Sequence, residues 1–205
     1  MVTPPRFLEG VRRWRALGRN RGETGVLPYL RVTDFLPREL ADEMFAELLQ
    51  QRDQFRIRSS QGPGGSRFYR MASPSLPSPI FLQRLAATLA EVERAFALDL
   101  REPHVELLAQ AYNDGSAFGL HSDAAAGGPN WKRRVSGVFY LHGQPRRFSG
   151  GELAIHGQDG RRHLVPADHN SIVMFRREAM HEVLPVRCPS QSFEDGRFSI
   201  NVWVS

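Results

Sequence analysis

Residues 112–123 have the sequence Tyr-Asn-Asp-Gly-Ser-Ala-Phe-Gly-Leu-His-Ser-Asp, and this stretch carries the strongest structural signal in the chain. A polar turn separates two segments, 104–112 and 117–122, that we predict to be strands. Side chains two residues apart in an extended segment project from the same face, so His121 and Asp123 can bind one metal ion together. The stretch therefore predicts a strand that ends in half of a metal site.

The rest of the C-terminal half is also patterned in short segments. Six further strands are predicted, at residues 133–141, 151–156, 161–165, 171–175, 180–186 and 197–204. Eight short strands separated by polar turns are typical of a sandwich or a jelly roll. Upstream, residues 26–32 and 54–58 predict strands, whereas Pro37 and Pro79 each open an amphipathic helix. Helices first and strands second predict an α+β fold in which the helices support one sheet from outside.

We interpret the chain as a single domain of residues 1–205, because a chain of this length and ordinary composition buries a sizeable core. Three parts are expected. Residues 1–25 form a basic N-terminal helix or arm, residues 26–102 supply supporting helices and strands, and residues 103–205 form the strand-rich core. Within the middle part, the Gly-, Ser- and Pro-rich residues 59–79 predict a mobile loop.

Charge and cysteine content narrow the setting of the protein. The formal net charge is +5, and residues 1–25 hold six arginines against two glutamates. Cys188 is the single cysteine, which excludes an intrachain disulfide and fits a reducing compartment. Arginines interrupt the N-terminal region before any apolar run reaches the length of a signal peptide or membrane helix. We expect a cytoplasmic protein with no membrane partner.

A metal site built on His121 and Asp123 needs a third ligand from elsewhere in the chain. His181 lies in the predicted strand 180–186 and can supply it. Two histidines and one carboxylate on one face of Fe(II) leave open positions, as in non-haem oxygenases. His104 and Glu106 have the same spacing as the first dyad, so spacing by itself leaves both dyads open.

The order and spacing of four motifs resemble the prolyl-hydroxylase-like branch of the Fe(II)/2-oxoglutarate-dependent dioxygenases. The resemblance covers residues 104–204 and implies a double-stranded β-helix, a form of jelly roll, as the core. It also implies that His121, Asp123 and His181 bind Fe(II) and form the catalytic centre, with 2-oxoglutarate and O2 as co-substrates. The motifs are residues 112–123, Gly150-Gly151-Glu152-Leu153, His181-Glu182-Val183-Leu184-Pro185-Val186 and Arg197-Phe198-Ser199.

The same resemblance assigns the residues that bind 2-oxoglutarate. The basic residue that holds the distal carboxylate lies on the last strand of the family, which places this role on Arg197. A guanidinium holds a carboxylate through two parallel hydrogen bonds. Ser199 lies on the same strand face as Arg197, and this polar face is expected to line the site. Tyr112 and Tyr140 match tyrosines that border the co-substrate.

The reaction implied by the resemblance is hydroxylation, with release of succinate and CO2. The substrate class stays open between a free amino acid, a peptidyl residue such as proline, and a natural-product scaffold. We expect substrate contacts from two loops near the metal. The candidate residues are Arg58, Arg67, Tyr69, Arg70 and Trp131.

Two functions of other classes compete with the enzyme hypothesis. A jelly-roll binding module can use a metal only to hold a carboxylate or a sugar, but it does not need a buried Arg197. A nucleic-acid oxygenase can use the basic arm at residues 1–25, but the sequence contains no nucleic-acid recognition motif. We therefore expect a small-molecule or peptide partner and no nucleic acid. The sequence carries no signal for an oligomeric state or for a role of residues 187–196.

Overall fold

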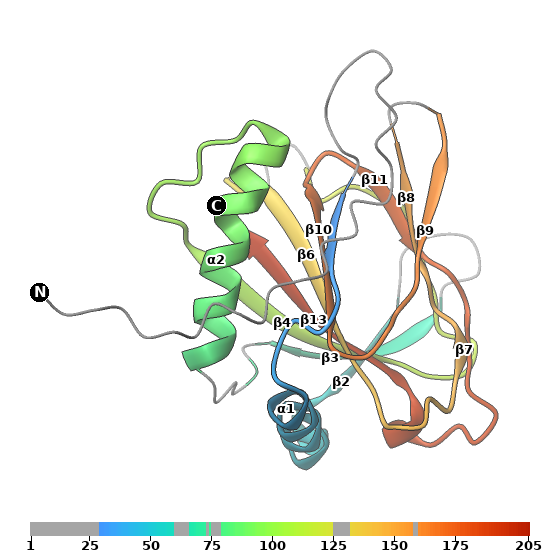
Figure 1. Ribbon diagram of the computed structural model, residues 1–205. Helices are drawn as coiled ribbons and strands as arrows, with labels where there is room; N and C mark the ends of the chain where they lie inside the picture. The colour runs from blue at the N-terminus through green and yellow to red at the C-terminus, as the bar shows by residue number, and fades with distance from the viewer. Residues whose placement is uncertain (1–28, 60–65, 73, 75–78, 125–131, 158–159) are drawn as a thin grey trace, which may run out of the picture.

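The computed structural model describes residues 29–59, 66–72, 74, 79–124, 132–157 and 160–205. These residues form antiparallel sheets and two α-helices, in agreement with the predicted α+β class (Figure 1). The largest sheet has seven strands in the order β1-β10-β6-β13-β4-β3-β2. Its strands are β1 (Leu30–Val32), β10 (Ser171–Arg176), β6 (Val135–Leu141), β13 (Arg197–Val204), β4 (Val105–Tyr112), β3 (Arg67–Ala72) and β2 (Arg56–Ser59).

A smaller, four-stranded sheet has the order β5-β11-β8-β9, and a short ribbon pairs β12 with β7. The strands of these two sheets are β5 (Phe118–His121), β11 (Met180–Val183), β8 (Leu153–His156), β9 (Arg162–Val165), β12 (Val186–Arg187) and β7 (Ser149–Gly150). Each of the eight segments predicted as strands beyond residue 103 contains one. The predicted strand 180–186 is divided, because β11 pairs with β8 whereas Val186 pairs with Gly150 in the ribbon.

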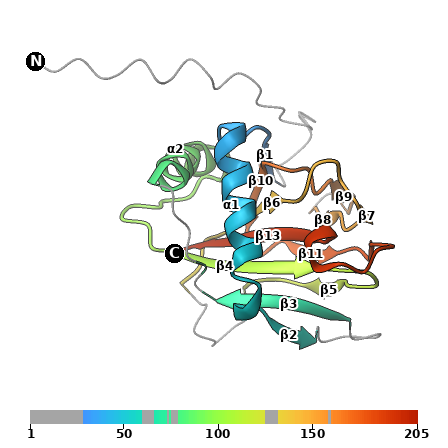
Figure 2. The same cartoon turned by 90° about the horizontal axis from the view of Figure 1, so that it is seen from below.

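Both helices pack on one face of the seven-stranded sheet (Figure 2). Helix α1 (Arg38–Gln50) follows Pro37, and helix α2 (Pro79–Phe96) begins at the predicted proline. Buried side chains recur at helical spacing on each helix, which explains why an amphipathic segment is stable here. They are Ala41, Met44, Phe45 and Leu48 in α1, and Phe81, Leu85, Thr88, Leu89, Val92 and Phe96 in α2.

The seven-stranded sheet has a core on each of its faces, because side chains alternate along every strand. In β13, Phe198, Ile200 and Val202 pack into the core beneath the helices. On the opposite face, Tyr140 of β6 packs with Leu153 of the smaller sheet and with other apolar side chains. The second core therefore joins the two sheets, and it surrounds the site described below.

The prediction of a mobile loop over residues 59–79 is wrong for its central part. Strand β3 lies there, and it pairs with both β2 and β4 in the large sheet. Phe68 and Met71 are buried, so the packing of two large side chains and the hydrogen bonds to β4 fix a segment whose flanks suggested a loop. Residues 60–65, 73 and 75–78 of the predicted loop lie outside the described residues, as does the basic arm of residues 1–25.

Residues 187–196, for which the sequence carries no functional signal, pack into the core through Phe193. Phe193 is buried in the short 3-10 helix η2 (Phe193–Asp195), and its ring packs against Phe55, Tyr69 and Phe198. A second 3-10 turn, η1 (Arg52–Gln54), precedes β2. No helix in the described part of the chain combines the length and the apolar character that crossing a membrane requires.

A pair of histidines near the end of β6, one buried (His142) and one half-buried (His169), predicts acid sensitivity of the fold. The backbone N–H of His142 donates to Nδ1 of His169 at 3.1 Å, and Nδ1 of His142 lies 2.9 Å from the carbonyl oxygen of Gly143. Burial lowers the pKa of His142 to about 4 and also lowers the pKa of His169. The unfolded chain therefore binds more protons than the folded chain between about pH 6.5 and pH 4, so stability falls as the pH falls through this window.

We expect His142→Asn to flatten this pH dependence, because an asparagine amide can still donate to the carbonyl oxygen of Gly143 but does not titrate. Melting temperatures at pH 7 and pH 4.5, measured with EDTA present, should differ less in the variant than in the unmodified protein. The exposed residue His104 provides the control, and His104→Asn should leave the difference unchanged. Equal differences in all three proteins would contradict the assignment.

Candidate functional site

His121, Asp123 and His181 form a cluster of possible metal ligands. One donor atom from each of the three side chains lies within 4.8 Å of the other two. The pairing of β5 with β11 places His181 directly opposite His121, with the ring centroids 4.1 Å apart. Asp123 follows β5, and its backbone N–H donates to the carbonyl oxygen of Arg177 at 3.0 Å. The structure thus brings together all three predicted ligands, although 58 residues separate the third from the second in sequence.

Backbone carbonyl groups orient both imidazole rings. Nδ1 of His121 lies 2.8 Å from the carbonyl oxygen of Gly119, and Nδ1 of His181 lies 2.9 Å from that of Ala179. A carbonyl oxygen only accepts, so each Nδ1 carries the proton. The lone pair on each Nε2 is therefore available to a metal, which is the usual arrangement for metal-binding histidines.

His181 is held in the neutral form that a metal ligand requires. Its side chain is almost fully buried, and the ring packs against Phe175 with the centroids 4.7 Å apart. Burial, together with a smaller effect of the neighbouring His121, lowers the pKa of His181 to about 4. Protons therefore compete weakly with a metal for this nitrogen at neutral pH.

The structure does not bring His104 and Glu106, the alternative dyad, together into a metal site. His104 is exposed, and Glu106 forms an ion pair with Arg133, with 2.6 Å between Oε2 and Nη2. Arg133 holds the pKa of the Glu106 carboxyl below its ordinary value. In the ranges that the structure describes, no group of three metal-ligating side chains includes either residue.

Arg197 is a buried cation near the metal-ligand cluster. Its side chain is 1% exposed, and Nε donates to the carbonyl oxygen of Gly151 at 2.8 Å. The guanidinium lies over the rings of Tyr112 and Tyr140, with its central carbon 5.0 and 4.8 Å from their centroids. Among the described residues, none accepts a hydrogen bond from the buried Nη2. A buried donor of this kind is costly unless a ligand completes it.

Gly151, the second of the two glycines before Glu152, has a structural reason to be glycine. Its φ of +73° is rare for residues with a side chain. A Cβ at this position would also lie 2.7 Å from Cδ of Arg197 and 2.9 Å from Val186. Glycine is therefore required for the backbone to approach the arginine and to accept its hydrogen bond.

The two predicted tyrosines have different environments. The Tyr112 hydroxyl donates to Oε1 of Gln110 at 3.1 Å, and its ring stacks on Phe68. The Tyr140 hydroxyl is buried and has no hydrogen-bond partner among the described residues. Burial raises the pKa of Tyr140, so this group remains a donor. Tyr140, rather than Tyr112, has a free hydroxyl next to Arg197.

The metal-ligand cluster and Arg197 line one cavity of about 350 Å³. Ser199, also predicted, is buried in its wall with its hydroxyl 3.5 Å from Oδ1 of Asn201. Gln110 and Ser136 line the same cavity and were not predicted. The signal that could have identified them is a polar residue within an otherwise apolar, buried strand, because such a side chain needs a polar partner.

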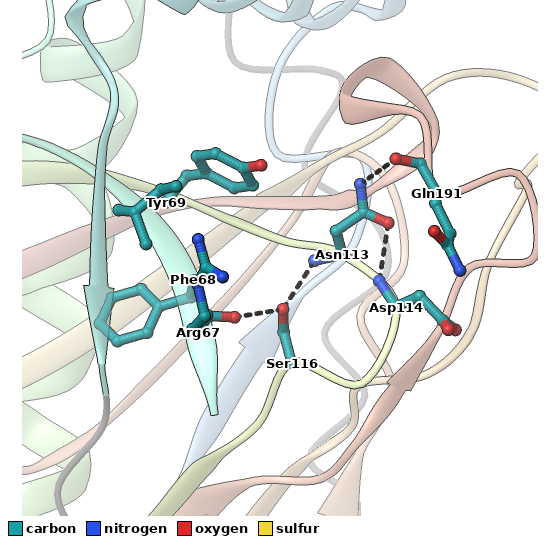
Figure 3. A pocket seen from close by; sticks show the side chains of 8 residues that line it. Arg67, Phe68, Tyr69, Asn113, Asp114, Ser116 and Gln191 are labelled. Carbon is teal, nitrogen blue, oxygen red and sulfur yellow. Dashed lines mark hydrogen bonds between the residues drawn. The ribbon is translucent and has the colours of Figure 1, made fainter. Parts of the chain in front are cut away.

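The predicted substrate contacts do not lie together. Arg70 lines the cavity of the metal-ligand cluster, whereas Arg67 and Tyr69 line a neighbouring pocket of about 360 Å³ (Figure 3). Arg58 is exposed on β2 and is not among the described residues that line either hollow. Trp131 lies outside the described residues. Side chains alternate between the two faces of a strand, so Arg70 faces away from its neighbour Tyr69.

The residues present fit Fe(II) and 2-oxoglutarate. Two neutral histidines and a carboxylate are the ligand set of non-haem Fe(II) oxygenases. The unpaired Nη2 of Arg197 and the unpaired hydroxyl of Tyr140 are two donors in one buried region, and a carboxylate can accept from both. Within the described part of the chain, neither this nitrogen nor this hydroxyl has a hydrogen-bond partner.

Comparison with known proteins gives a family for the same part of the chain. Residues 107–205 match the model of the 2OG-Fe(II) oxygenase superfamily. The match includes the three clustered ligands and Arg197.

Two curated relatives are cyanobacterial. An "uncharacterized PKHD-type hydroxylase" of Synechocystis sp. is 26% identical over 191 residues, which cover 86% of this chain and 62% of that protein. A PKHD-type hydroxylase of Gloeothece citriformis is 35% identical over 81 residues, which cover 39% of this chain and 36% of that protein. The chain therefore spans about three fifths or less of the length of these relatives.

Solved structures share the fold. A Pseudomonas putida prolyl-4-hydroxylase superposes with a TM-score of 0.64 at 23% identity, covering 86% of this chain and 91% of that one. A prolyl hydroxylase of Trichoplax adhaerens, solved with a fragment of hypoxia-inducible factor, has a TM-score of 0.61 at 15% identity, covering 86% and 83%. The fold of this chain therefore matches that of solved prolyl hydroxylases.

We expect His121→Ala, Asp123→Ala and His181→Ala each to abolish binding of Fe(II) at micromolar concentration, because two remaining ligands make a poor site. Binding is measured anaerobically by titration. His104→Ala is the matched control and should bind Fe(II) as the unmodified protein does. If the control lost the metal while His121→Ala retained it, the ligand assignment would be wrong.

Proposed function

Because residues 107–205 match the model of the 2OG-Fe(II) oxygenase superfamily, we propose that this chain is a hydroxylase that uses Fe(II), 2-oxoglutarate and O2. His121, Asp123 and His181 would hold the metal. Arg197 and the neighbouring Tyr140 would hold the distal carboxylate of 2-oxoglutarate, and Tyr112 and Ser199 line the same cavity as Arg197. The products would be a hydroxylated substrate, succinate and CO2.

The observation that carries this proposal is the buried guanidinium of Arg197. A metal-dependent binding module, the alternative from another class, has no use for a cation enclosed beside the metal ligands. Burying such a cation without a partner is unfavourable, whereas a bound diacid would pair with it. Because Nη2 of Arg197 and the hydroxyl of Tyr140 lack partners among the described residues, the cavity supports the enzyme.

The contribution of the chain to the reaction is to bind, orient and exclude water. When bound, Fe(II) and 2-oxoglutarate would supply the oxidation of the substrate by O2, coupled to decarboxylation. The neutral Nε2 atoms of His121 and His181 stay available to the metal, because their Nδ1 protons are committed to backbone carbonyl groups. Phe118 and Phe175 pack against these rings, and their apolar surface keeps water from the ligands on that side.

For the fold, we propose that the two packed sheets form a double-stranded β-helix. Their antiparallel pairing and the shared core around Tyr140 and Leu153 support this arrangement. The helices α1 and α2 would then support the large sheet from outside, as the sequence predicts.

For the substrate, we propose a peptidyl residue, with proline as one candidate, over a free amino acid. The cavity of the metal-ligand cluster and the neighbouring pocket both have Phe68 in their lining, which supports an extended substrate that spans both. A free amino acid would fill only the first. Figure 3 also shows the polar side of the neighbouring pocket, where the amide of Asn113 donates to the carbonyl oxygen of Gln191 at 3.0 Å.

We expect the purified protein with Fe(II), ascorbate and O2 to convert 2-oxoglutarate to succinate, measured by mass spectrometry. In Arg197→Ala the KM for 2-oxoglutarate should rise about 100- to 4,000-fold, because breaking one side of a buried ion pair costs about 3–5 kcal/mol. Arg197→Lys should rescue this loss partly, since an ammonium group lacks the planar fork.

The matched control is Arg187→Ala, because Arg187 is an exposed arginine of the β12 strand that precedes β13. Its KM for 2-oxoglutarate should equal that of the unmodified protein. Tyr140→Phe should raise the KM about 3- to 10-fold, the effect of one hydrogen bond. Metal binding without any succinate formation would favour the binding module, and an unchanged KM in Arg197→Ala would move the role to another residue.

A further inference from the structure

The two carboxylate oxygens of Asp123 differ in the hydrogen bonds that they accept. Oδ2 accepts a hydrogen bond from Oγ of Ser136 at 2.6 Å and another from Nε1 of Trp203 at 2.9 Å. Among the described residues, none donates to Oδ1. The two bonds occupy one oxygen and leave the other free for a metal.

The two donors come from directly opposed positions in the large sheet. Trp203 of β13 pairs with Ser136 of β6, and on its other side it pairs with Glu106 of β4. Opposed residues in neighbouring strands project from the same face. A single row across the sheet therefore places a carboxylate, an indole and a hydroxyl side by side, and the indole and the hydroxyl line the cavity.

The indole of Trp203 is itself held in place. The guanidinium of Arg133 lies over the Trp203 ring with its central carbon 4.0 Å from the centroid, and it is 8% exposed. Two nitrogens of Arg133 donate to Glu106, Nε to Oε1 at 3.2 Å and Nη2 to Oε2 at 2.6 Å. A two-pronged ion pair of this kind fixes the plane of the guanidinium, and the stacked indole is fixed with it.

We propose that Ser136 and Trp203 are positioning residues for the metal ligand Asp123, and that the pair Arg133–Glu106 clamps Trp203. This inference rests on the proposed function. With Oδ2 engaged by two donors, Asp123 would bind the metal through Oδ1 alone. A carboxylate that bound through both oxygens would take an additional position at the metal, one of those needed by the co-substrates. The row thus sets how many positions the protein leaves open.

The same row across the sheet gives a structural role to Glu106, one residue of the second dyad in the sequence. Glu106 lies two residues after His104, a spacing suited to metal binding, but its carboxylate holds Arg133 and through it Trp203. The carboxylate of Glu106 therefore acts on the metal site without contacting the metal. Residues that orient metal ligands typically change metal affinity by 10- to 100-fold when they are removed.

The test uses Co(II) as a probe metal, without 2-oxoglutarate and without turnover. Trp203→Phe keeps an aromatic ring under Arg133 but removes the N–H, and Ser136→Ala removes the hydroxyl. Each variant should bind Co(II) about 10-fold more weakly than the unmodified protein, and the double variant about 100-fold more weakly. The visible absorption bands of bound Co(II) should also shift, because release of Oδ2 changes how the carboxylate coordinates.

The matched control is Ser171→Ala. Ser171 is as buried as Ser136, but its hydroxyl donates to the carbonyl oxygen of Asp168, and Ser171 is not among the described residues that line the cavity. This variant should keep both the Co(II) affinity and the spectrum. Circular dichroism checks the fold of every variant. If Trp203→Phe does not fold, Ser136→Ala decides by itself.

The outcomes separate this inference from the proposed function. Unchanged affinity and an unchanged spectrum in Ser136→Ala and Trp203→Phe would overturn the positioning role, even if the unmodified protein forms succinate. A lower affinity in Ser171→Ala equal to that of Ser136→Ala would also overturn it, because the effect would then be a general one of losing a buried hydroxyl. If the unmodified protein bound no Co(II), the proposed metal site itself would fail.

Discussion

Strand β13 is the constraint on which the rest of the molecule depends. It pairs along its whole length with β4 and from Phe198 to Val204 with β6, so it lies at the centre of the large sheet. Its period of two sends Phe198, Ile200 and Val202 into the core beneath the helices. The same period sends Arg197 and Trp203 into the cavity on the other face. A single register of β13 therefore both packs the core and places the side chains of the site.

Electrostatics divides the site into groups that are already satisfied and groups that await a ligand. Glu106 and Arg133 neutralise each other, and the Tyr112 hydroxyl is bound to Gln110. Arg197 keeps a charge with an unused N–H in a region nearly closed to water. The fold accepts this unfavourable burial because the rings of two tyrosines lie against the guanidinium and Gly151 accepts one of its hydrogen bonds. These contacts reduce the free-energy cost of burying the Arg197 guanidinium, and its Nη2 still has an N–H that can donate to a carboxylate.

Local periodicity accounts for what could be predicted from the sequence. The helix that begins at Pro79, the strand 197–204 and the shared face of His121 and Asp123 each follow from spacing within a few residues. Tertiary contacts account for the rest. The sequence predicts a loop where β3 lies, because the strand is stabilised by its pairing with β4, which lies far along the chain. The sequence leaves Glu106 open as a metal ligand, because its true partner, Arg133, is 27 residues away. A Gly-rich flank and a suggestive spacing carry no information about such partners.

The geometry of the large sheet also links the two ends of β13 in function. A shift of β13 by one residue would turn Arg197 away from the cavity and, in the same step, remove Trp203 from Asp123, because every side chain would change face. Folding thus cannot place Arg197 in the cavity without also placing the indole N–H of Trp203 at Asp123. The apolar residues between them, which must face the helices, enforce this coupling through burial alone. A well-packed core therefore also fixes the relative position of the proposed metal and 2-oxoglutarate sites.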